Sequence, residues 1–76
     1  MPFVAIKAYP GKDRGKTIEL AEEIKALVME KYGVPEQAVT VSFEEVEKDQ
    51  WEEKVGKVDI EPKMDKVLIY HGEKRY

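Results

Sequence analysis

The sequence predicts a small α/β protein of the α+β sandwich type. Its centre is a βαβ unit with parallel strands and an extra C-terminal helix, which dimerises into a four-stranded sheet with helices on one face. Two short segments, residues 3–9 and 39–45, have strand-like composition, and an amphipathic helical segment lies between them. The 76 residues include no cysteine, so no disulfide can cross-link this small chain. Domains of this size usually need a cross-link or a partner subunit, and association is what this sequence leaves open.

The first predicted strand covers residues 3–9. Its residues alternate between two faces, as the two-residue period of a strand requires. Apart from Lys7 the segment is uncharged, so both faces are expected to be largely covered. Pro10 and Gly11 then mark a turn.

The helical segment runs from Asp13 to about residue 32. Asp13 is a suitable N-cap, and Leu20, Ile24 and Val28 form an apolar stripe at four-residue spacing. Gly33 is a natural residue for the position after the helix, and the following proline prevents the helix from resuming directly.

The second predicted strand, residues 39–45, follows a possible short turn at residues 35–38. It alternates cleanly between apolar and polar side chains. A strand, a helix and a strand of these lengths make a βαβ unit, in which the strands are parallel and the crossover is right-handed.

The C-terminal third has a less regular sequence pattern, so its secondary structure is harder to predict. Residues 46–59 contain the single tryptophan and a possible turn at Gly56. Pro62 suits the first turn of a helix, which we expect to run to about Ile69 and to end by Gly72. Residues 73–76 are expected to form a disordered tail.

Two parallel strands and one helix do not close a core. One face and both edges of the sheet stay exposed, which favours pairing with a second copy. The pair would have four strands and two helices on one face. No internal repeat or linker divides the sequence, so residues 1–76 are expected to form one domain.

Composition excludes several classes of function. The 13 basic and 16 acidic residues are mixed along the chain, so no nucleic-acid-binding stripe stands out. No apolar run approaches the length of a membrane span, and the N-terminus does not resemble a signal peptide, so we expect a cytoplasmic protein. With one histidine, at position 71, and no cysteine or glycine-rich phosphate loop, the sequence indicates no metal and no cofactor.

Pro2 is the main candidate for chemistry. Removal of Met1, which the small second residue favours, would expose a prolyl secondary amine with its lone pair held in a fixed direction. In an apolar pocket the charged form of this amine is disfavoured, so its pKa falls toward the range of a general base. The structural alternative is that Pro2 merely begins an edge strand, where its missing N–H does no harm.

The chain resembles the 4-oxalocrotonate tautomerase family. The resemblance lies in the opening MPFVAIKAYPGKD, the helix that follows it, and the strand VTVSFEEV, and it covers roughly residues 2–51 in register. Trp51 and the later segment Ile60-Glu61-Pro62-Lys63-Met64 are more similar to the dimeric branch of that family. No single motif is long, so the specificity lies in their combination with a proline at position 2.

The resemblance implies a role for several side chains. Lys12 falls where the archetype has an arginine that binds a substrate carboxylate, and Arg14, two residues on, is the next candidate for that role. Trp51 falls at the aromatic pocket position, although core or interface packing is the commoner role of a lone tryptophan. Thr40 replaces a second arginine, so a different electrophile or a substrate with one carboxylate is expected.

These features together predict a cofactor-independent tautomerase, an isomerase that moves a proton between oxygen and carbon of a 2-oxo or 2-hydroxy-dienoic or arylpyruvate-type acid. The alternative is a non-catalytic dimeric binding or scaffold protein that retains the fold. The partners expected are a small carboxylate substrate and a second copy of the chain. A dimer is favoured over a hexamer because hexameric members of the family end in a glycine-rich hairpin, which the sequence does not suggest here.

Overall fold

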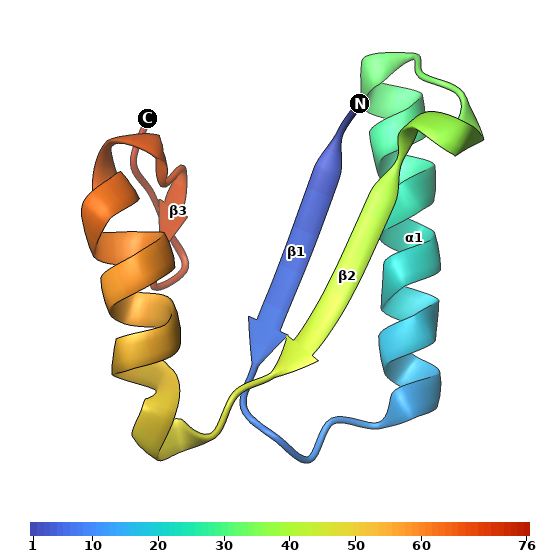
Figure 1. Cartoon of the computed structure of the whole chain (residues 1–76). Helices are drawn as coiled ribbons and strands as arrows, with labels where there is room; N and C mark the ends of the chain where they lie inside the picture. Colours follow the sequence, from blue (N-terminus) through green and yellow to red (C-terminus); the bar gives the residue numbers. More distant parts are fainter. The chain divides into compact units, whose positions relative to one another are not determined.

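The computed structural model describes all residues from Met1 to Tyr76 and divides into two compact units, residues 1–46 and 47–76 (Figure 1). The first unit contains β1 (Phe3–Ala8), α1 (Arg14–Tyr32), the short 3-10 turn η1 (Glu36–Ala38) and β2 (Thr40–Glu45). β1 and β2 are parallel, and α1 connects them. The predicted βαβ unit is therefore confirmed.

The register of the two strands runs from Phe3 opposite Thr40 to Ala8 opposite Glu45. Two backbone hydrogen bonds extend the pairing: the N–H of Thr40 donates to the carbonyl of Pro2 at 3.1 Å, and that of Val46 to Ala8 at 2.9 Å. Each strand has one paired edge and one open edge, because the sheet contains only these two strands.

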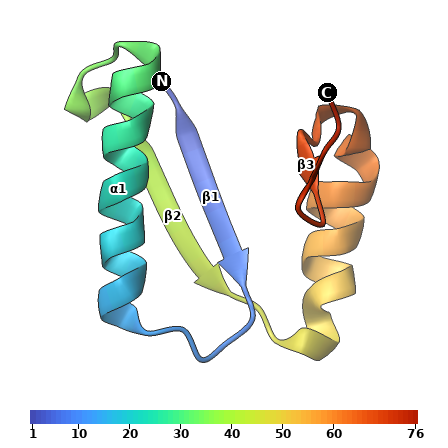
Figure 2. The ribbon, with the colours of Figure 1, turned by 180° about the vertical axis from the view of Figure 1, so that it is seen from behind.

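Helix α1 lies along one face of the strands, as the front and rear views show (Figures 1 and 2). The strand residues of that face, Val4, Ile6, Val41 and Phe43, are half-buried, whereas Phe3, Ala5, Thr40 and Ser42 of the other face are exposed. Only the helix side of this small sheet is covered within the unit.

Both ends of α1 follow the local sequence. The Asp13 carboxylate accepts the N–H of Lys16 at 3.2 Å, and the Thr17 hydroxyl donates to the Asp13 carbonyl at 2.9 Å. Gly33 ends the helix with a φ of 62°, in the left-handed region where a Cβ is unfavourable, and its N–H donates to Met29. The predicted caps are both confirmed.

The second unit differs in detail from the sequence-based expectation. A C-terminal helix is present, but its turns begin earlier: η2 (Lys48–Gln50), a π-helix η3 (Glu52–Ile60) and a 3-10 segment η4 (Glu61–Lys66) follow one another. Gly56 lies buried inside η3, so the predicted turn there is wrong. Helical structure stops at Lys66 rather than near Ile69.

The chain ends in a hairpin instead of the expected helix end and disordered tail. β3 (Ile69–Tyr70) pairs antiparallel with β4 (Glu73–Lys74). The two residues between them, His71 and Gly72, have φ values of 50° and 80°, the positive values that the tightest hairpin turns require. The dipeptide was therefore a turn signal, which the helical interpretation of this segment missed.

Little apolar surface is buried within one copy. Val46 and Val55 are the buried hydrophobic residues, whereas Phe3, Leu27 and Tyr32 are exposed by 65%, 54% and 72%. Exposed apolar surface of this extent is typical of chains that associate. The predicted dimer is consistent with it but remains a prediction. None of the helices is long and apolar enough to span a membrane.

A carboxyl pair links the first residue of η3 to the first residue of η4. The side chain of Glu52 lies over Gly56, where a Cβ would come within 2.9 Å of its carboxylate, and it forms a hydrogen bond with Glu61. This hydrogen bond and the charge of Glu52 raise the pKa of Glu61, and nearby Lys57 opposes that shift. The pair is favourable while it shares a proton and repulsive when both carboxyls are ionised.

Since the pKa of Glu61 is raised in the folded state, its stabilising contribution is present at acid pH and is lost as pH rises through that pKa. We therefore expect Glu61→Gln to raise the melting temperature near neutral pH, because the charge is removed and a donor to Glu52 remains. The advantage should vanish below the ordinary carboxyl pKa of 4.5. Thermal unfolding from pH 3 to 8, with Glu53→Gln as a control of equal charge, tests this. An equal gain in both variants at neutral pH would assign the effect to net charge.

Candidate functional site

Pro2 lies immediately before β1 and is fixed by the strand pairing. Its carbonyl accepts the Thr40 N–H, so the residue is held at the point where both strands begin. Its side chain is half-buried. The N-terminal residue left after Met1 removal would therefore be attached to the ordered sheet and not to a loose tail.

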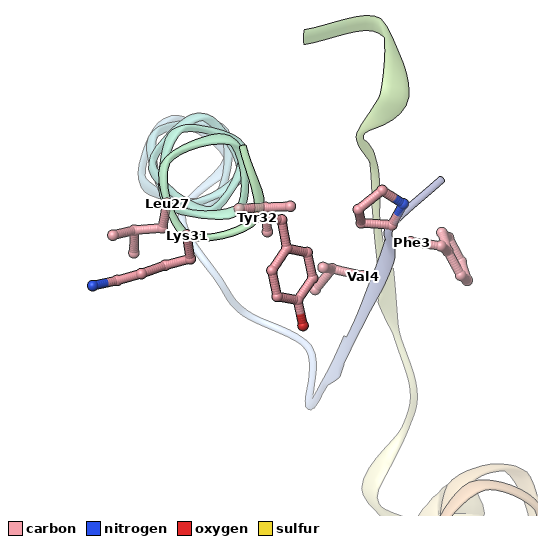
Figure 3. A pocket seen from close by; sticks show the side chains of 7 residues that line it. Phe3, Val4, Leu27, Lys31 and Tyr32 are labelled. Carbon is pink, nitrogen blue, oxygen red and sulfur yellow. The ribbon is translucent and has the colours of Figure 1, made fainter. Parts of the chain in front are cut away.

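A groove of about 540 Å³ opens beside Pro2, between the start of β1 and the last turns of α1 (Figure 3). Most of its lining is apolar, and two of its side chains are polar. The lining residues are Pro2, Phe3, Val4, Leu27, Val28, Lys31 and Tyr32. A largely apolar groove of this kind disfavours a charged ammonium, which is the condition a prolyl base needs.

The labelled side chains of the groove have different orientations (Figure 3). Val4 points from β1 toward the helix, and Phe3 points to the opposite side of the strand. The Tyr32 ring descends from the end of α1 beside Val4, whereas the Lys31 side chain extends away from both. Tyr32 is thus the polar side chain that faces this part of the strand.

The helix residues that line the groove were not among the predicted site residues. Leu27, Lys31 and Tyr32 belong to no sequence motif. The available signal was topological: in a βαβ unit the helix returns toward the level where the first strand begins. Its last turn must therefore approach residue 2.

Lys12 and Arg14 lie at the other end of β1, in and after the loop that leads to α1. Together they line a separate hollow with Thr17, Phe43 and Glu45. The Lys12 N–H approaches the Glu45 carboxylate at 3.4 Å. The two cations are neighbours, and they lie away from the groove beside Pro2.

The six residues of β1 separate these two places. At about 3.3 Å per residue the strand spans roughly 20 Å. Pro2 and Lys12 of one copy are therefore too far apart to contact the same small substrate. A site that uses both must take them from different copies of the chain.

Thr40 and Trp51 complete the set of positions singled out by the sequence. Thr40 is paired with Phe3, so its side chain belongs to the exposed sheet face and not to the helix side. Trp51 is half-buried at the start of η3 and belongs to the second unit. Its predicted role as a wall of the Pro2 pocket stays a prediction. No group of three or more histidine, cysteine or acidic side chains forms a candidate metal site.

Comparison with known proteins shows which family the chain is similar to. The family model described as tautomerase enzyme matches residues 2–53, a segment that includes Pro2, Lys12, Thr40 and Trp51. The chain belongs to the tautomerase family. The resemblance to 4-oxalocrotonate tautomerase in the N-terminal two thirds of the sequence is thereby confirmed.

Individual tautomerases are similar over most of the chain. Tautomerase PptA of Enterobacter sp. (strain 638) is 30% identical over 74 residues, which cover 95% of this chain and 96% of that protein. A probable tautomerase of Xylella fastidiosa is 31% identical over 72 residues, or 95% of this chain and 88% of its own length. The likeness to both therefore includes the C-terminal unit, beyond the segment that the family model matches.

A solved structure supports the fold. The crystal structure of TomN, a 4-oxalocrotonate tautomerase homologue in the tomaymycin biosynthetic pathway, superposes with a TM-score of 0.62 and 28% identity. The match covers 66% of this chain and 77% of that chain. The α+β architecture of this tautomerase is thus shared with a solved member of the family.

Proposed function

We propose that this chain is a cofactor-independent tautomerase that converts a 2-hydroxy-2-enoic acid into its 2-oxo form, with Pro2 as the general base once Met1 has been removed. The observation that supports this most directly is the position of Pro2, in a largely apolar groove at the start of β1. The family membership supports an isomerase of this type.

The proposed reaction is a proton transfer. The uncharged Pro2 amine takes the proton from the C2 hydroxyl of the enol, and the resulting ammonium returns a proton to C3. The C2–O bond becomes a carbonyl, the C2–C3 double bond becomes single, and the amine is regenerated. No external oxidant, reductant or water enters the balance.

A second copy is part of the proposal. β1 has an open edge, and two such edges joined antiparallel would place the start of one strand beside the end of the other. Pro2 of one copy would then lie near Lys12 of the partner subunit, whose ammonium would hold the substrate carboxylate. Exposed Leu20 and Leu27 along α1 supply apolar surface for the same contact.

The remaining predicted site residues have secondary roles in this proposal. Arg14 lies beside Lys12 in the same hollow and is a second cation for the carboxylate. Trp51 is proposed as an aromatic wall that excludes water from the amine. Thr40 supplies no positive charge, which favours a substrate with one carboxylate over a dicarboxylate.

The first test is Pro2→Ala in protein shown by mass spectrometry to lack Met1. We expect kcat to fall by about two to three orders of magnitude with phenylenolpyruvate, because the ring-held secondary amine is lost, while the fold is retained. The matched preparation is wild-type protein that keeps an additional N-terminal residue, which should be folded and inactive because its Pro2 nitrogen is an amide. Full activity in either protein would rule out the amine as the base.

The second test is Lys12→Ala. We expect kcat/KM for a carboxylate substrate to fall about ten-fold, equivalent to about 1.4 kcal/mol for one charged contact. Lys25→Ala is the control: it removes the same charge from α1, but that ammonium is held by Glu22 and Glu36 at 3.3 and 2.7 Å. Unchanged kinetics of the Lys12 variant would transfer the role to Arg14.

The third test is the mass of the assembly in solution. Light scattering is expected to give a dimer, because one antiparallel contact covers the open β1 edge. The C-terminal hairpin removes the sequence-based argument against a hexamer, so the prediction now rests on that edge alone. A mass of six protomers would refute the dimer, and a mass of one would refute the argument from exposed edges.

A further inference from the structure

Tyr32, the last residue of α1, is a hydrogen-bonding group without a partner. Its side chain is 72% exposed and forms no hydrogen bond or ring contact with the rest of the chain. It lines the groove that contains Pro2, and its ring lies beside Val4 (Figure 3). A phenol in this position has one donor and one acceptor available for a bound molecule.

The other polar groups near the groove are less suitable. Lys31 also lines it, but its side chain extends away from Tyr32 and Val4 (Figure 3). Thr40 shares the opposite sheet face with Phe3. Within one copy, Tyr32 is therefore the polar side chain that lies over the strand residues adjoining Pro2.

We propose that Tyr32 is a catalytic residue of the Pro2 site, and that its phenol donates a hydrogen bond to the C2 oxygen of the substrate. This inference rests on the proposed function. When the Pro2 amine removes the proton from the C2 hydroxyl, negative charge develops on that oxygen. A hydrogen-bond donor placed at that oxygen stabilises the charge until C3 is protonated. Tyr32 keeps its own proton throughout, so the balance of the reaction is unchanged.

The lining also indicates the class of substrate. Val4, Leu27 and Val28 offer apolar contacts. The cation that lines the groove, Lys31, extends away from the strand (Figure 3). A second carboxylate placed here would lose its hydration without gaining a partner. The groove therefore fits a 2-hydroxy-2-enoic acid that has one carboxylate and an apolar or aromatic substituent on C3.

The test uses the ketonisation of phenylenolpyruvate by the assembled, Met1-free protein. Tyr32→Phe keeps the ring and removes the hydroxyl, and we expect kcat to fall about ten- to a hundred-fold with little change in KM. Tyr76→Phe, which removes the same atom from another exposed tyrosine, should leave both constants unchanged. An unchanged kcat in Tyr32→Phe, or a loss confined to KM, would overturn the assignment.

Three further measurements distinguish a catalytic hydroxyl from a packing role of the Tyr32 ring and test the substrate class. Tyr32→His, which keeps a ring-borne donor, should recover part of the activity lost in the phenylalanine variant, and no recovery counts against the proposal. Impairment in Tyr32→Leu but not in Tyr32→Phe would make the ring a packing wall and refute a catalytic hydroxyl. Faster turnover of the dicarboxylate 2-hydroxymuconate than of phenylenolpyruvate would refute the substrate class.

Failure of this inference differs from failure of the proposed function. If Pro2→Ala is inactive and Tyr32→Phe is fully active, Pro2 catalysis stands and the role of Tyr32 is refuted. If Pro2→Ala is fully active, the prolyl base itself is refuted.

Discussion

The parallel pairing of β1 with β2 is the constraint on which the site depends. Parallel neighbours cannot be joined by a tight turn, so the chain must cross back over the sheet through α1. The crossover carries the end of α1 toward the start of β1, where Tyr32 joins the groove beside Pro2. It leaves the loop with Lys12 at the other end of the strand. The backbone hydrogen bond between Thr40 and Pro2 then fixes Pro2 in register with β2.

Local signals made the first unit predictable. Asp13 and Gly33 act at the two helix ends through contacts within a few residues, and such contacts depend little on the rest of the fold. The alternation in residues 39–45 identified the second strand because one of its two faces is covered by the helix. The C-terminal unit has no comparable periodicity. In that unit the side chain of Glu52 lies over Gly56, a contact that no repeating sequence pattern indicates.

The residues of the candidate site could be predicted only in part, for a different reason. Pro2 could be proposed from the sequence because its expected chemistry needs only one residue at one position. Tyr32 could not, since its proposed role depends on where the crossover ends and not on its neighbours in sequence. Lys12 and Arg14 were both candidates for binding a carboxylate, but the sequence did not show that β1 separates both from Pro2. Distances along a strand become visible only when the ends of that strand are assigned.

In the proposed dimer, the open edge of β1 would link stability to catalysis. One copy buries few hydrophobic side chains, and the surface left uncovered includes the β1 edge and neighbouring leucines of α1. Covering that edge with an antiparallel second copy would bury this surface and, by the same symmetry, bring the strand start of each copy to the strand end of the other. A chain arranged in this way need not evolve its stabilising contact and its catalytic contact separately. Changes at the edge should therefore alter assembly and activity together, whereas changes confined to the Tyr32 hydroxyl should alter activity alone.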